Sequence, residues 1–245
     1  MSGVRSVAGV DGWHSVEGLT WMTFSRARVL MANKAHSGLR RCIRTRRVGV
    51  RMVRAAHEVG VRRLAVEALP QSAEGVLGPI REMPVTASGY LAQPDVRSLI
   101  AAALELGWTL WAYGAAIPAD ADPADADPAD ADPAELLSLE FTNRREQEQA
   151  HNLCQILAAA PARPLLVWSG NSDAAKEANG AEVPIGHRFA ALSATDPFVI
   201  DQTVTVDFTG RVQAVDRRVA GWPGPDARQL RRHRWSAPRP GTPRR

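Results

Sequence analysis

The sequence has few cysteines and no long apolar run, and both absences narrow the class of protein. Its two cysteines are Cys42 and Cys154, too few for a disulfide framework and in keeping with a reducing compartment. No stretch approaches the roughly 18 to 20 apolar residues that a membrane span needs. The N-terminal residues also lack the apolar core of a secretory signal. Together these absences predict a cytoplasmic protein with no membrane span.

Clustered metal ligands are also missing. No spacing of Cys and His fits a structural zinc site. No Cys-x-x-Cys-His segment is present, so any haem would bind non-covalently. The segment 118–135 repeats Pro-Ala-Asp-Ala-Asp, but it has no Gly or closing Glu at the spacing of an EF-hand. Because a proline recurs every fifth residue and the aspartates repel one another, we expect an extended, solvated loop there.

The net positive charge of the chain comes from one end of it. The formal net charge is +4, yet residues 211–245 hold ten Arg against two Asp, a net charge of +8, which leaves −4 for the rest. That segment is rich in Pro and Arg, and we expect a disordered tail. Five arginines also recur at helical spacing within 39–59: Arg40, Arg44, Arg47, Arg51 and Arg54. No aromatic residue interleaves with them for base stacking, so a solvated helix face is favoured over nucleic-acid binding.

The remaining sequence alternates between apolar runs and amphipathic segments. Hydrophobic residues make up 45% of the 245, enough for one substantial core. Candidate strands are 27–33, 62–67, 108–113, 164–169 and 198–208, and helical patterns cover 39–59, 95–106 and 143–160. This alternation predicts a single α/β domain with a mostly parallel mixed sheet flanked by helices. The last strand alternates polar and apolar residues, and an edge position is expected for it.

The predicted organisation has three parts. Residues 1–26 are an N-terminal extension, 27–210 form the α/β domain with the 118–135 loop inserted in it, and 211–245 are the basic tail. Pro94 fits the first turn of the 95–106 helix, and Gly107 fits its C-terminal cap.

Polar residues follow four of the predicted strands. Lys34 and His36 follow the first, Glu67 closes the second, Tyr113 closes the third, and Asn171 and Asp173 follow the fourth. The carboxyl ends of parallel strands share one rim of the sheet, so these residues are candidates for a common site. Taken singly, each has an ordinary structural explanation: a turn for His36, an ion pair with an arginine for Glu67, a helix N-cap for Asp173. Glu146, three residues after Asn143, resembles the end of a capping box, and Arg145 beside it fits a surface position.

Six segments together resemble a known family. They are RVLMANKAHSG, RRLAVEALP, SGYLAQPDVRSLIAAALELGWTLWAYG, NRREQEQAHNLCQIL, PLLVWSGNSDAAKE and FAALSATDPFVIDQTV. Their order and spacing across about residues 27–208 resemble the ChaN-like group (haem-binding uptake, Tiki), relatives of the erythromycin esterases. The resemblance implies a mixed α/β fold with a site at the strand ends. Members include metal-dependent peptidases, ester hydrolases and haem-binding proteins, so fold alone does not define the function.

The family's site residues carry over only in part. His36, Glu67, and the pair Arg145–Glu146 match the family pattern. Lys34 stands where the first motif has Glu, Gly114 follows Tyr113 where the family has an acid, and Asp173 stands where the late motif has His. A protonated lysine cannot ligate a metal as a glutamate would, whereas Asp173 can still accept a proton or ligate a hard metal.

Two hypotheses follow from this altered site. In the first, a hydrolase acts on a small ester or amide. His36 is then the general base, oriented by Glu67 or Glu146, Arg145 neutralises an oxyanion, and a Lys34–Asp173 ion pair replaces a Glu–His pair.

In the second, the same fold is a pseudoenzyme or ligand-binding module. Haem is the candidate ligand, with Tyr113 or His36 as its axial ligand, and Asn171 lines the site. The partner in both cases is a small molecule, the cofactor is a divalent metal or haem if there is one, and nucleic acid is the least favoured partner.

Overall fold

The structure is a computed structural model that describes residues 15–34, 39–69, 78–84, 90–115, 138–170, 173–178 and 180–202, with the side chains of 39–42 and 90 excluded. Its sheet has the strand order β3-β4-β2-β5-β1-β6. The strands are β1 (Val29–Asn33), β2 (Arg63–Val66), β3 (Pro79–Ile80), β4 (Thr109–Ala112), β5 (Leu165–Ser169) and β6 (Phe198–Ile200). All pairs are parallel except β3 with β4. The carboxyl ends of five strands therefore lie along one rim.

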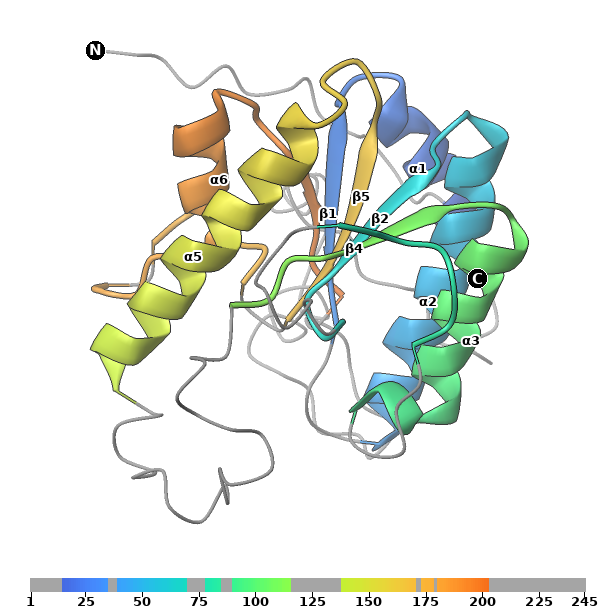
Figure 1. Ribbon diagram of the computed structural model, residues 1–245, viewed down its shortest axis with the longest axis horizontal. Helices are drawn as coiled ribbons and strands as arrows, with labels where there is room; N and C mark the ends of the chain where they lie inside the picture. Colours follow the sequence, from blue (N-terminus) through green and yellow to red (C-terminus); the bar gives the residue numbers. More distant parts are fainter. Residues whose placement is uncertain are drawn as a thin grey trace, which may run out of the picture.

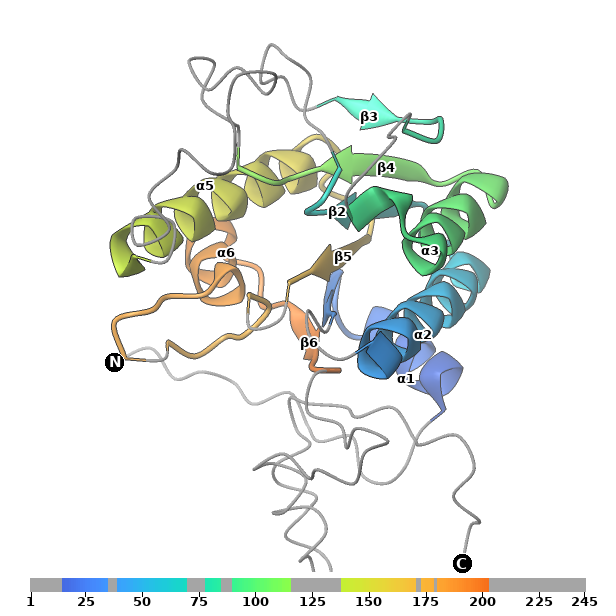
Figure 2. The ribbon, with the colours of Figure 1, turned by 90° about the horizontal axis from the view of Figure 1, so that it is seen from below.

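Helices cover both faces of this sheet. They are α1 (Val16–Phe24), α2 (Leu39–Glu58), α3 (Pro94–Glu105), α5 (Leu139–Ala158) and α6 (Ile185–Ser193), with a short 3₁₀ turn at Tyr90–Ala92. Helices α1, α2 and α3 lie on one face, and α5 and α6 lie on the other (Figures 1 and 2). The predicted α/β class, a mostly parallel mixed sheet flanked by helices, is confirmed. None of these helices, within the described ranges, is both long and apolar enough to cross a membrane.

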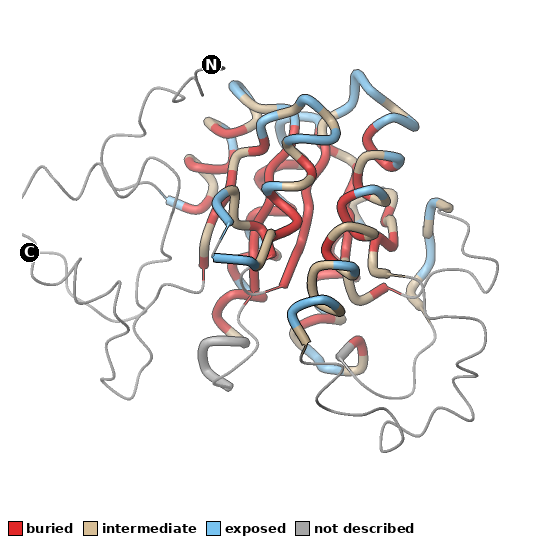
Figure 3. The backbone as a smooth tube through the Cα atoms, turned by 90° about the vertical axis from the view of Figure 1, so that its left-hand side faces the viewer, coloured by how far each residue is buried: buried red, intermediate tan, exposed pale blue. Residues whose placement is uncertain are grey.

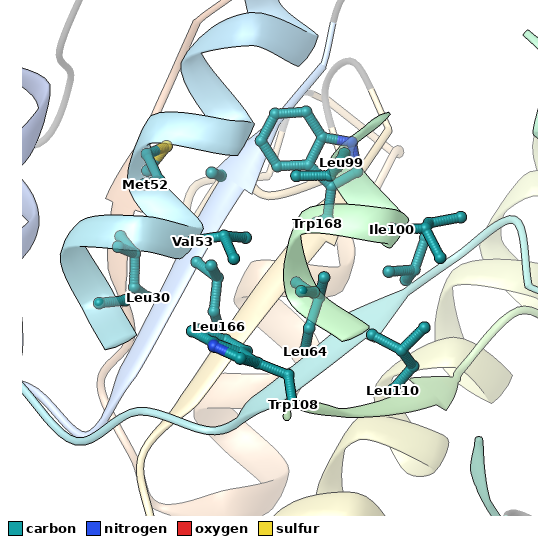
Figure 4. Close-up of a cluster of buried hydrophobic side chains, with 14 of the residues drawn as sticks. Leu30, Met52, Val53, Leu64, Leu99, Ile100, Trp108, Leu110, Leu166 and Trp168 are labelled. Atoms are coloured by element: carbon teal, nitrogen blue, oxygen red, sulfur yellow. The ribbon is translucent and has the colours of Figure 1, made fainter. Parts of the chain in front are cut away.

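The core consists of two apolar layers, one on each face of the sheet. Strands β1, β2 and β5 are buried along their whole length, which is why they read as continuous apolar runs (Figure 3). Under α2 and α3, the side chains of Met52, Leu99, Trp108 and Trp168 pack together (Figure 4). On the opposite face, Tyr113 belongs to the layer beneath α5 and α6.

Several helix and strand positions agree with those predicted from the sequence. Pro94 begins α3, and Gly107 follows its C-cap with a φ of 73°, a left-handed conformation that suits glycine. Strand β6 lies at the edge of the sheet as expected, and among the described strands it pairs with β1 alone. The loop 118–135 and the tail 211–245 lie outside the described residues.

Other elements were not anticipated. Helix α1 precedes the predicted domain start at residue 27, yet its Val16 and Leu19 are buried in the core. The two-residue β3 and the nine-residue helix α6 were also not among the predicted elements. Helix α5 begins at Leu139, because the Ser138 hydroxyl accepts a hydrogen bond from the Phe141 N–H at 3.1 Å.

Two local interpretations were wrong. Asn143 lies inside α5, so Glu146 does not close a capping box there. Arg44, expected on a solvated face of α2, is buried, while Arg47, Arg51 and Arg54 are exposed. The stripe of arginines is therefore only partly at the surface.

Candidate active site

The end of strand β5 brings the site residues together. The Trp168 carbonyl accepts hydrogen bonds from the Glu67 N–H at 3.4 Å and from the Tyr113 hydroxyl at 3.3 Å. The next carbonyl, that of Ser169, accepts one from the Lys34 N–H at 3.1 Å. The residues that follow β1, β2 and β4 are thus fixed around one central strand, as expected for the carboxyl rim of a parallel sheet.

Lys34 and Glu67 form the first charged pair of the site. The Lys34 Nζ lies 3.0 Å from Glu67 Oε2, and the two side chains are 4% and 18% exposed. Gln149 of α5 donates from Nε2 to Glu67 Oε1 at 3.5 Å. The expected ion pair of Lys34 with Asp173 is not formed, because the lysine reaches across the end of β5 to Glu67 instead. The Glu67 carboxylate is consequently held by donors on both oxygens.

The second charged pair lies on the inward face of α5. Glu146 is buried, with Oε1 2.9 Å from Arg145 and Oε2 accepting the Ile185 N–H at 3.0 Å. The latter bond anchors the first residue of α6 to α5. Burial raises the pKa of Glu146, although the Arg145 guanidinium and the Ile185 N–H oppose that shift. Arg145 is 39% exposed and so reaches from this carboxylate toward solvent.

Asp173 is the third carboxyl group of the site and the most perturbed one. It is not the N-cap of a helix, since α6 begins at Ile185 with Pro184 as its N-cap, although the Asp173 backbone carbonyl accepts the Gly186 N–H at 2.9 Å. Its side chain is buried beside two other carboxylates. Burial, then the charges of Glu67 and Glu146, raise the pKa of Asp173 to about 7, against the weaker opposing influence of Arg145 and Lys34. This carboxyl group is therefore poised to exchange a proton near neutral pH.

Tyr113 supports the site without being accessible from it. The side chain is fully buried, and its hydroxyl donates to the Trp168 carbonyl. Burial, followed by the charges of Glu67, Asp173 and Glu146, raises its pKa well above the usual range. A haem iron would need the phenolate as its axial ligand, and that species is strongly disfavoured here. The described environment of Tyr113 does not fit haem ligation.

The fit to a divalent metal is no better. Among the described residues, no group of three or more His, Cys, Asp or Glu is arranged to hold a metal ion. Both oxygens of Glu67 and both of Glu146 already accept hydrogen bonds or ion pairs. The part of the site that the structure describes thus resembles a network of charge pairs rather than a metal centre.

Most residues of this site were predicted from the sequence, and one was not. Lys34, Glu67, Glu146 and Asp173 converge with Arg145, while His36 and Asn171 lie outside the described residues. Gln149 was overlooked. It is 2% exposed, touches Glu67, and leaves its Oε1 without a hydrogen-bond partner in the described part of the chain. Its position three residues after Glu146, which places both on one face of a helix, was the available signal.

Taken together, the site holds three carboxyl groups and two cations in a largely buried setting. Lys34 and Arg145 balance two of the carboxylates, and the third, Asp173, is the group that titrates near neutrality. Such an arrangement can accept a proton from water, return it to a leaving group, and stabilise developing negative charge.

Comparisons with known proteins add a likeness of fold. No family model matches the chain, and no curated protein matches it. A solved structure entitled "The structure of the type III effector HopBA1" superposes with a TM-score of 0.54 at 14% identity, covering 82% of this chain and 88% of that chain. At this level of identity, the likeness concerns the α/β fold alone.

Proposed function

We propose that the protein is a hydrolase of the ChaN-like type that cleaves a small ester or amide by acid–base catalysis at the carboxyl rim of its sheet. The observation that carries this proposal is Asp173, a buried carboxyl group with a pKa of about 7 beside two cations. A general base works best when its pKa lies near the working pH. Asp173 takes the role that the sequence assigned to His36.

The proposed reaction has two proton transfers. Asp173, as the carboxylate, accepts a proton from a water molecule while the water oxygen attacks the carbonyl carbon of the substrate. The positive charges of Lys34 and Arg145 stabilise the oxyanion that forms. Asp173 then returns the proton to the oxygen or nitrogen of the leaving group as the carbon–heteroatom bond breaks. Glu67 and Glu146 hold the two cations in place.

The test is a pH–rate profile. The probes are p-nitrophenyl acetate, p-nitrophenyl butyrate and alanine p-nitroanilide, assayed from pH 5 to pH 9. We expect kcat/KM to rise with pH around a midpoint near 7, where Asp173 titrates. Asp173→Asn should lower it by roughly 100-fold or more, the usual contribution of a general base. Glu177→Gln is the matched control, because Glu177 is exposed and close in the chain.

The alternative is a non-catalytic ligand-binding module of the same fold. It would be supported if none of the three probes were turned over by protein whose circular dichroism and cooperative unfolding show it to be folded. Turnover that survives Asp173→Asn would instead remove Asp173 from the mechanism.

A further inference from the structure

A cavity lies at the rim of the sheet opposite the candidate active site. Its volume is about 440 Å³, within the range of roughly 300 to 1,000 Å³ typical of small-molecule sites. It is lined by residues at the amino ends of β2 and β4, by the edge strand β3, and by the turn after α5: Arg62, Arg63, Pro79, Arg81, Gly107, Thr109, Trp111, Ala160 and Arg163. Because the candidate active site occupies the carboxyl ends of the strands, the two sites are separate.

The lining of this cavity is strongly basic. Four of its nine lining residues are arginines, and none is Asp or Glu. In the described part of the chain, none of the four forms an ion pair with a carboxylate. The pKa of Arg63 is lowered by burial and then by the nearby charge of Arg163. The arginines thus repel one another, and a bound anion would relieve that repulsion.

Two of the arginines are fixed in place by backbone carbonyls. Arg62 donates to the carbonyls of His57 and Val61 at 2.6 and 2.7 Å. Arg63 donates to the carbonyls of Ile156 and Ala160, and its guanidinium lies 5.8 Å from the centre of the Trp111 ring. These contacts hold both cations at the ends of α2 and α5, where a positive charge also suits the helix dipole.

The other two arginines have no such structural task. Arg81 follows the edge strand β3, and Arg163 precedes β5, and both are exposed. Neither donates a side-chain hydrogen bond to any described residue. Their guanidiniums can therefore turn toward a ligand in the cavity without breaking an existing contact.

We propose that this cavity binds a small molecule bearing a phosphate or diphosphate group. Several guanidiniums around one concavity match the multiple oxygens of a phosphate group, which arginine binds through paired N–H donors. The dimensions of the cavity favour a small phosphorylated molecule over a nucleic-acid strand or a membrane surface, both of which need an extended basic face.

The experiment titrates inorganic pyrophosphate into the full chain by isothermal calorimetry. The test variant is Arg81→Ala/Arg163→Ala, which leaves the structural arginines intact. The control is Arg54→Ala/Arg97→Ala, which removes the same charge from α2 and α3 on the other face of the sheet. We expect the test variant to raise the Kd for pyrophosphate by at least 10-fold, and the control variant to change this Kd by less than twofold. Asp173→Asn should bind pyrophosphate like the wild type, because the two sites are independent.

Three results would overturn the proposal. Wild-type protein that does not bind pyrophosphate would exclude the ligand class. Equal weakening in the test and control variants would show that net charge, including the arginines of residues 211–245, accounts for the binding. Retention on phosphatidylglycerol vesicles that needs Arg81 and Arg163, without pyrophosphate binding, would replace the small molecule by a membrane surface.

Discussion

Lys34 and Glu67 form an ion pair of 3.0 Å although their strands are not neighbours in the sheet. Strand β5 lies between β1 and β2, so the two backbones are about 10 Å apart at a spacing of roughly 4.8 Å per strand. Both side chains are long enough to meet over the end of β5, where the carbonyls of Trp168 and Ser169 hold the two backbones. The pair thus ties three strands together at the rim that carries the candidate site.

We predict that this pair stabilises the fold more than a surface pair does. Lys34→Met leaves the Glu67 carboxylate without its cation in a largely buried environment. We expect the free energy of unfolding to fall by about 2 kcal/mol. This loss is smaller than that for breaking a wholly buried pair, because Glu67 is partly hydrated. Lys176→Met breaks the more exposed pair with Asp196, whose side chains are 22% and 48% exposed, and should cost under about 1 kcal/mol. Urea denaturation at pH 8 measures both.

A double-mutant cycle separates the interaction energy of Lys34 with Glu67 from the contributions of their other neighbours. Lys34→Met combined with Glu67→Gln should recover part of the loss, because no charge is then left unpaired. The prediction is wrong if Lys34→Met lowers the free energy of unfolding no more than Lys176→Met does. It is also wrong if the cycle gives no coupling energy between Lys34 and Glu67.

We predict an unusual dependence of stability on pH from Asp173. Its pKa rises from 3.8 to about 7 on folding, so the folded state binds more protons than the unfolded state between those values. This group therefore lowers stability as the pH rises from about 4 to 7, and its effect levels off above that. Asp173→Asn removes this effect. The free energy of unfolding of the variant should therefore exceed that of the wild type by up to about 4 kcal/mol at pH 8, with little difference at pH 4.

Urea midpoints of the two proteins at pH 4, 6 and 8 check this prediction. A constant difference across the three pH values would mean that Asp173 titrates with an ordinary pKa. If the variant is more stable and also inactive, a single residue accounts for both the buried-charge penalty and the proposed catalysis, as functional groups often reduce stability.

The sequence allowed the fold to be predicted because the central strands are buried on both faces. Their continuous apolar runs and the helices between them indicate parallel βαβ units, and parallel strands place Lys34, Glu67 and Tyr113 at one rim whatever the strand order. The partners within the site depend on that order. Lys34 was expected to pair with Asp173 in place of a Glu–His pair of the family pattern, and only the arrangement β2-β5-β1 shows that Glu67 is its partner.

Other features depend on segments that are far apart in the chain, so local sequence patterns could not predict them. Strand β3 has two residues and forms only because β4 is there to pair with it. The basic cavity combines residues at the amino ends of β2 and β4, residues of the edge strand β3 and residues of the turn after α5, and no single segment of the sequence contains it. The raised pKa of Asp173 arises from burial between elements that are far apart in the chain.

The last prediction concerns Gly114, the position where the resemblance to the ChaN-like group leads one to expect an acidic residue. A Cβ atom at this position would lie 2.7 Å from the Glu67 carbonyl oxygen, closer than side chains tolerate. The neighbouring backbone has little room to move, because Asn152 donates to the carbonyls of both Tyr113 and Gly114. Gly114→Ala should therefore lose roughly 2 kcal/mol of stability, as overpacking typically does.

Gly114→Asp should lose more, because the larger side chain also brings a carboxylate up against the Glu67 carbonyl oxygen. An acidic residue at this position would then destabilise the protein instead of improving its activity. Gly78→Ala is the matched control, since a Cβ there meets nothing within 4 Å, and its effect should be near zero or slightly stabilising. Thermal unfolding of the three variants tests the point: a Gly114→Ala protein as stable as Gly78→Ala would show that this rim of the sheet can open, and that the lost carboxylate is not forbidden by packing.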